Sequence, residues 1–218
     1  MTEPRLIALF PLGLVLFPGA VIPLHIFEER YKLMINRCLE SDGVFGVVLI
    51  RQGWEVGPPA EPYDVGTFAR IVKTERLDGG KLNLTLAGDG RFRLLRQVPG
   101  EPYPQAEVES LDEDASGVPE RLVRLVRAQF ETYVQTIRRL SRQHEGTVLL
   151  PGRPLDLSYA VAASLQISRT EQQLLLEESA ADRIAHESQI LRREALLLAR
   201  LGAVSTRRLR TPQEVPVN

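Results

Sequence analysis

The sequence has a single cysteine and no excess of charge of either sign. Cys38 excludes a disulfide within the chain and suits a reducing compartment, so we expect a cytoplasmic protein. Acidic and basic residues nearly balance, with a formal net charge of −1. A protein that binds nucleic acid or an anionic membrane through its general charge would show a basic stripe. The composition therefore argues against nucleic-acid and membrane partners.

Motifs for nucleotide and metal chemistry are also missing. The only Gly-Lys pair, Gly80-Lys81, is followed by Leu82, where a phosphate loop needs Ser or Thr. Gly88-Asp89-Gly90 lacks the third glycine of a dinucleotide fingerprint and predicts a turn. The three histidines are His25, His144 and His186, and none of them has another ligand residue at the spacing of a metal site. We expect no cofactor, no metal and no catalytic residue, and we interpret His25 and Cys38 as structural.

A stretch without Asp, Glu, Lys or Arg runs from Leu6 to Phe27, and it must be buried in protein, buried in lipid or cleaved off. A membrane-spanning helix needs about 20 apolar residues with closed backbone hydrogen bonds, but Pro11, Pro18 and Pro23 each remove a donor. Arg5 before the run favours a signal peptide, yet no Ala-x-Ala-like site follows. We therefore predict buried strands at Leu6–Phe10, Leu14–Phe17 and Ala20–Phe27, with a tight turn at Phe17-Pro18-Gly19.

The remainder of the first half predicts one helix among short strands. Tyr31, Met34, Ile35 and Cys38 fall on one face of a helix that starts near Glu28 and stops before Gly43. Further strands are predicted at Val44–Ile50, Val65–Leu77, Lys81–Leu86, Arg91–Val98 and Gln105–Leu111, with a Pro- and Gly-rich loop at 51–63 and a hairpin turn at 78–80. Six or so short strands with one inserted helix predict a small, partly closed β-barrel.

The composition changes at the acidic run 111–117, after which apolar residues follow a helical period. A first helix contains Leu122 to Leu140, Asp156 caps a shorter one, and Ser168 with Glu171 forms a capping box. A long last helix is predicted to end at Gly202. We predict an α+β protein with a barrel subdomain at 1–115, a C-terminal α-helical bundle at 116–204 and a disordered tail at 205–218.

Three blocks of residues carry a family resemblance. The first comprises Phe10-Pro11-Leu12, Val15–Gly19 and Pro23–Glu28 with Arg30-Tyr31; the second comprises Gly66–Ile71, Leu82–Leu84 and Gly90–Leu94; the third is Leu165–Ser168. Together they resemble the amino-terminal, substrate-binding domain of Lon proteases, from about residue 5 to residue 200. The resemblance implies a PUA-like barrel that binds unfolded or apolar polypeptide segments. It also implies a free-standing module that lacks the ATPase and Ser-Lys protease domains, so we expect no enzyme activity.

Large or charged residues in expected loops and at the first helix start are the candidates for a peptide-binding surface: Trp54, Tyr63, Glu29, Arg30 and Lys32. Trp54 is either an aromatic anchor for a peptide or a pin that folds back on the barrel. Arg30 is either an ion-pair partner or part of a groove rim. A recognition module of this kind would act alone or recruit a client to a protease machine. Two alternatives stay open, namely an RNA-binding PUA-like protein and a small-molecule pocket at the barrel–helix junction.

Overall fold

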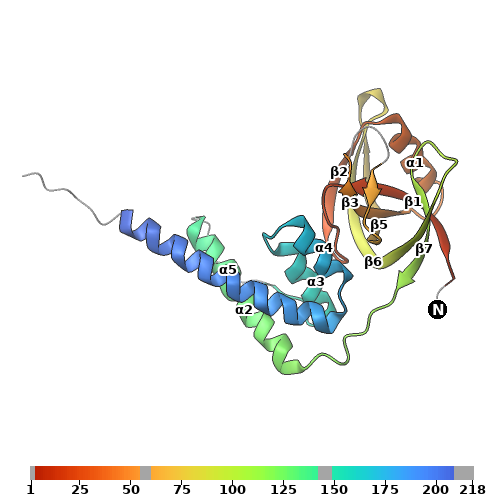
Figure 1. Ribbon diagram of the computed structural model, residues 1–218. Helices are drawn as coiled ribbons and strands as arrows, with labels where there is room; N and C mark the ends of the chain where they lie inside the picture. Colours follow the sequence, from red (N-terminus) through yellow and green to blue (C-terminus); the bar gives the residue numbers. More distant parts are fainter. Residues whose placement is uncertain (1–2, 55–59, 142–148, 209–218) are drawn as a thin grey trace, which may run out of the picture.

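Seven strands and one α-helix make up the N-terminal half of the computed structural model, which describes residues 3–54, 60–141 and 149–208 (Figure 1). The strands are β1 (Arg5–Leu12), β2 (Val21–Ile26), β3 (Val44–Gln52), β4 (Glu61–Pro62), β5 (Val65–Arg76), β6 (Leu82–Val98) and β7 (Gln105–Leu111). The helix α1 (Glu29–Leu39) follows β2, and a short 3-10 turn, η1 (Asp78–Gly80), joins β5 to β6.

The sheet closes into a barrel. Its strands are ordered β1-β7-β6-β5-β3, and β1 also pairs with β3 in parallel, with Leu9 opposite Gly46. β2 adds to β6, and β4 adds to β3. The predicted α+β barrel is confirmed, and this ring of strands is closed rather than partly open.

Two local predictions in this half are wrong, and one contact explains both. Leu14–Phe17 is not a strand, and Gly88-Asp89-Gly90 is not a turn but lies inside β6. The chain at Phe17 crosses β6 so closely that a Cβ on Gly88 would lie 2.3 Å from the Phe17 carbonyl oxygen. The Gly19 amide donates to Gly88 O at 2.9 Å, and the Gly88 amide donates to Ala20 O at 2.8 Å. Gly88 is therefore required by close approach of two backbones.

The predicted turn at Phe17-Pro18-Gly19 is confirmed. The Ala20 amide donates to Phe17 O at 3.1 Å, and Gly19 has a φ of +78°, a conformation that glycine adopts without a Cβ clash. The Leu16 carbonyl accepts a 2.6 Å hydrogen bond from the buried Thr67 hydroxyl, so this segment is anchored on both sides of the turn.

The barrel core surrounds one face of α1. Tyr31, Met34, Ile35 and Cys38 are buried there, as the spacing predicted, and the Tyr31 ring stacks on Phe10 at 4.1 Å between centroids. Burial raises the pKa of the Cys38 thiol to about 11, which leaves it protonated at neutral pH. The interpretation of Cys38 as a core thiol is confirmed.

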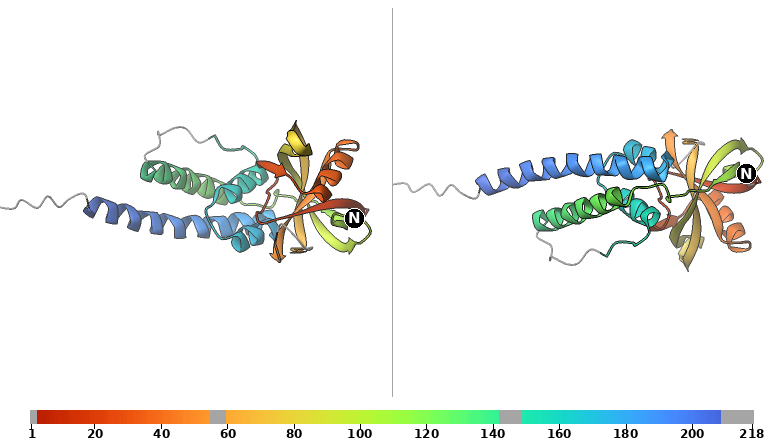
Figure 2. Two further views of the ribbon diagram at one scale, coloured as in Figure 1. Left: turned by 90° about the horizontal axis from the view of Figure 1, so that it is seen from above. Right: turned by 90° about the horizontal axis from the view of Figure 1, so that it is seen from below.

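The second half contains α2 (Glu120–Leu140), α3 (Pro154–Ser164), α4 (Arg169–Glu177) and α5 (Ala180–Arg208). α2 and α5 lie side by side and extend away from the barrel, whereas α3 and α4 lie next to it (Figure 2). The Ser168–Glu171 capping box at the start of α4 is present. The apolar side chains that join these helices form one cluster, which also includes Phe17 and Val65 of the barrel. The two halves therefore share a core at their junction.

Two predicted helix boundaries differ in the structure. Asp156 lies in the first turn of α3, which begins at Pro154, and its carboxylate pairs with Arg153 at 2.7 Å instead of capping the helix. α5 passes Gly202 and reaches Arg208, because an interior glycine costs a helix only about 1 kcal/mol. Residues 205–208 of the predicted tail are therefore helical, and 209–218 lie outside the described residues.

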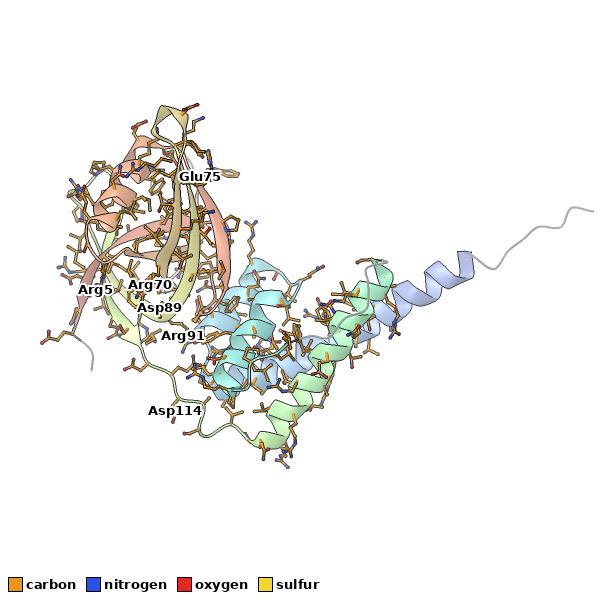
Figure 3. All side chains as sticks on the ribbon, turned by 180° about the vertical axis from the view of Figure 1, so that it is seen from behind. Arg5, Arg70, Glu75, Asp89, Arg91 and Asp114 are labelled. Atoms are coloured by element: carbon orange, nitrogen blue, oxygen red, sulfur yellow. The ribbon has the colours of Figure 1, made fainter. Side chains whose placement is uncertain are left out.

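A buried charge network joins the halves, with Glu113 at its centre. Glu113 lies between β7 and α2, and its carboxylate pairs with Arg91 of β6 at 3.1 Å and with Arg183 of α5 at 2.6 Å. The Tyr159 hydroxyl of α3 donates to the same carboxylate. The Arg183 side chain is fully buried, and the Arg91 and Glu113 side chains are 6% and 7% exposed. Figure 3 shows Arg91 where the barrel faces the helices.

Both arginines of this network also bind the C-terminal end of α4. The Glu178 carbonyl accepts from Nη1 of Arg91 at 2.8 Å and from Nη1 of Arg183 at 3.1 Å. Carbonyls at the end of a helix have no intrahelical partner, so cations there satisfy them and complement the helix dipole. Nε of Arg183 donates to the Ser158 hydroxyl at 2.7 Å, which contacts Glu187 at 3.0 Å. Burial raises the pKa of Glu187 well above its ordinary value.

Replacing Gly88 by alanine is expected to lower the free energy of unfolding by about 1–3 kcal/mol, because the new Cβ would clash with the Phe17 carbonyl. Gly90→Ala is the matched control, since its nearest non-neighbouring atom would be 4.0 Å from the new Cβ. Urea unfolding of both variants measures the difference. Equal stability of the two variants would contradict the close approach.

Glu113→Gln is expected to lower the free energy of unfolding by about 3–5 kcal/mol, because two buried arginines lose their shared counter-charge. Glu109→Gln serves as the control, because its pair with Arg93 is exposed and long at 3.6 Å, and such pairs contribute about 0–1 kcal/mol. A loss in Glu113→Gln no larger than in the control would show that the network contributes little.

Candidate functional site

Trp54 and Tyr63 line one hollow on the surface, with a volume of about 540 Å³. The hollow lies between the end of β3 and the start of α4, and it includes Leu49, Ile50, Arg51 and Arg169. The structure thus brings together two of the five residues that the sequence suggested. It adds two arginines, one from the barrel and one from the helical half.

Short-range backbone features position the two aromatic side chains. Gly53 has a φ of +104°, which turns the chain out of β3 directly before Trp54. The Tyr63 amide donates to Leu49 O at 2.9 Å, which holds Tyr63 beside β3. The Arg51 guanidinium lies 5.0 Å from the centre of the Tyr63 ring, a cation–π arrangement.

Trp54 is 81% exposed, the second-highest exposure among the large apolar side chains that the structure describes. A pin that folds back on the barrel would be buried, so the structure contradicts that interpretation of Trp54. An exposed indole leaves a large apolar surface in water without a partner in the described part of the chain. Such aromatic side chains are typical anchors in protein interfaces.

The other three candidate residues do not line this hollow. Lys32 bonds through Nζ to Glu29 at 2.7 Å and to the Gly79 carbonyl at 2.9 Å, which ties α1 to the β5–β6 connection. Arg30 pairs with Glu28 at 3.0 Å and lies 4.6 Å from the centre of the Tyr31 ring. Arg30 is thus an ion-pair partner, the first of its two interpretations. A role of Glu29, Arg30 and Lys32 in binding stays a prediction without support from this geometry.

A groove of about 680 Å³ lies at the barrel–helix junction, where a small-molecule pocket was an open alternative. Its lining includes Gly88 and Ala160, and its charged side chains include Arg91 and Glu113. These two are already paired with each other, and Arg91 also donates to the Leu176 and Glu178 carbonyls. Of the charged side chains in this groove, Arg91 and Glu113 are therefore already paired within the protein.

The outward face of the barrel carries ion pairs between neighbouring strands. Arg70 pairs with Asp89 at 3.0 Å, Arg93 with Glu109 at 3.6 Å, and Arg96 with Glu107 (Figure 3 labels Arg70 and Asp89). Arginines that already face carboxylates do not form the positive surface that phosphate contacts require. Within the described residues, no cluster of three or more His, Cys, Asp or Glu could hold a metal ion. No helix among them is long and apolar enough to cross a membrane.

Comparison with known proteins identifies the family. Residues 7–193 match the ATP-dependent protease La (LON) substrate-binding domain. The chain belongs to this family. It is 32% identical over 178 residues to Lon protease 2 of Syntrophobacter fumaroxidans and 30% identical over 185 residues to Lon protease 2 of Myxococcus xanthus. Each match covers 80% of this chain and 22% of the relative, so the chain spans about a fifth of their length.

Solved structures agree with this assignment. A Lon N-terminal domain protein from Xanthomonas campestris superimposes with a TM-score of 0.63 and 26% identity, covering 84% of this chain and 96% of that one. The N-terminal domain of a Mycobacterium avium complex Lon protease has the same fold at 14% identity, with a TM-score of 0.58 over 86% of this chain and 98% of that one. The Lon-type substrate-recognition fold that the sequence blocks indicated is confirmed.

Trp54→Ala is expected to change the free energy of unfolding by less than about 0.5 kcal/mol, because the indole is 81% exposed and leaves no core cavity. Phe130→Ala, in the helical core at 3% exposure, should cost about 3–5 kcal/mol under the same conditions. Thermal and urea unfolding measure both. A loss above about 2 kcal/mol in Trp54→Ala would restore the pin interpretation.

Proposed function

We propose that this protein is a non-catalytic, cytoplasmic recognition module that binds unfolded or apolar polypeptide segments through the Trp54 hollow. The family match to a substrate-binding domain supports the type of partner. The exposure of Trp54 is the observation that supports the location of the binding site, because the ring lies beside the hollow without a partner among the residues that the structure describes. Ile50, which is half-buried in the same lining, adds apolar surface for a client side chain.

A recognition module of this kind requires no chemistry of its own. It can hold a client segment in an extended form or recruit it to a separate protease machine. The RNA-binding alternative has less support, because cross-strand carboxylates neutralise the arginines on the outer face of the barrel. Phosphate contacts would also give binding a steep dependence on salt concentration.

The proposal is tested with a permanently unfolded client, such as reduced and carboxymethylated α-lactalbumin, titrated in a binding assay with the purified protein. Trp54→Ala is expected to weaken binding by about 1–3 kcal/mol, as for the loss of an interface hot spot. Leu149→Ala is the control, because Leu149 is 93% exposed and lies outside the hollow. Undiminished affinity in Trp54→Ala, or tight RNA binding with a steep salt slope, would overturn the proposal.

A further inference from the structure

Two arginines from different halves of the molecule, Arg51 and Arg169, line the Trp54 hollow. Arg169, the first residue of α4, is exposed, and no described carboxylate lies within ion-pair distance of it. Arg51 faces Glu61 at 3.6 Å and Asp64 at 3.5 Å, at or beyond the limit of a hydrogen bond. Shorter contacts with carboxylates, of 2.7–3.0 Å, are made by Arg70, Arg153 and Arg193, whereas Arg93 pairs with Glu109 at 3.6 Å.

The apolar part of the hollow lies beside these guanidinium groups. The exposed Trp54 ring and the half-buried Tyr63 and Ile50 side chains supply surface for an aliphatic or aromatic group. The Tyr63 ring also holds the Arg51 guanidinium at 5.0 Å, which limits the orientations of its donors. A guanidinium presents a planar fork of donors that fits a carboxylate, and a preoriented fork loses less entropy on binding.

We propose that the hollow selects polypeptide segments that carry a carboxylate next to an apolar side chain. The carboxylate lies between Arg51 and Arg169, and the apolar side chain lies on Trp54. Two sources supply this chemistry, namely an Asp or Glu inside an apolar segment and the free carboxylate at the C-terminus of a client. This inference rests on the proposed function and adds the chemical class of segment that is bound. It also explains why the hollow needs both halves, because each contributes one arginine.

The test uses Trp54 as its own reporter, since it is the only tryptophan in the chain. Short tryptophan-free peptides are titrated while indole fluorescence is recorded, and calorimetry measures the same affinities independently. One pair ends in Leu-Phe with either a free carboxylate or a carboxamide. A second pair, amidated at the end, contains either Leu-Glu-Phe or Leu-Gln-Phe. Each carboxylate peptide is expected to bind at least about tenfold more tightly than its neutral partner.

Arg169→Gln is expected to lower the ratio of carboxylate to neutral peptide affinity by about tenfold. The affinity for the neutral peptides is expected to stay unchanged. Arg121→Gln is the control, because Arg121 is an exposed arginine on α2 that does not line the hollow. It makes the same change in charge and is expected to keep the full preference. Thermal unfolding confirms that both variants are folded.

The outcomes separate this inference from the proposed function. Carboxylate and neutral peptides that bind equally well to the hollow would overturn the carboxylate selection and leave polypeptide recognition intact. An equal loss of preference in Arg121→Gln would also overturn it, since general charge would then be responsible. If neither the peptides nor the unfolded clients bind, both the carboxylate selection and the proposed polypeptide recognition are overturned. A preference confined to one peptide pair would identify which carboxylate source the hollow takes.

Discussion

The contact of Glu113 with Arg91 and Arg183 is the interaction on which the rest of the arrangement depends. It joins β6 of the barrel, the segment before α2, and α5 at one buried point. The same two arginines bind the carbonyls at the end of α4, so they fix where that helix lies. α4 in turn carries Arg169 at its first turn, at the Trp54 hollow. The buried ion network thus holds the C-terminal end of α4, while Arg169 at the N-terminal end of the same helix lines the hollow.

Burial of so many charges requires that each is satisfied by a partner. Two guanidinium groups share one carboxylate, which leaves an excess of positive charge. The guanidinium groups of Arg91 and Arg183 donate further hydrogen bonds to backbone carbonyls, namely those of Leu175, Leu176 and Glu178. The Tyr159 ring adds a cation–π contact 4.1 Å from Arg183. Because removal of one partner would leave the others buried and unpaired, the network favours the arrangement of the halves in which all three groups are paired. The shared apolar cluster with Phe17 and Val65 supports the same arrangement.

The sequence could predict the features that depend on local pattern. The buried face of α1, the capping box of α4 and the buried strand β3 each follow from spacing or residue type within a few positions. Gly88 could not be interpreted in this way, since glycine serves a turn or a close approach equally, and the segment that approaches lies far away in the sequence. Trp54 and Tyr63 were chosen by residue type and the fold places both at the hollow, while their role in binding stays a prediction. Arg169 was missed because only the fold brings α4 to the end of β3, and no local signal marks it.

The most direct test of this account is the distance between the halves, measured by electron–electron double resonance with spin labels at Glu75→Cys and Arg121→Cys. Both positions are exposed, and the buried Cys38 thiol, with its pKa raised to about 11, is protected from labelling. The account predicts one narrow distance distribution in the otherwise unaltered protein and a broad one when Glu113→Gln is added. A distribution that is broad from the start, or equally narrow in both proteins, would contradict the claim that the Glu113 network fixes the two halves.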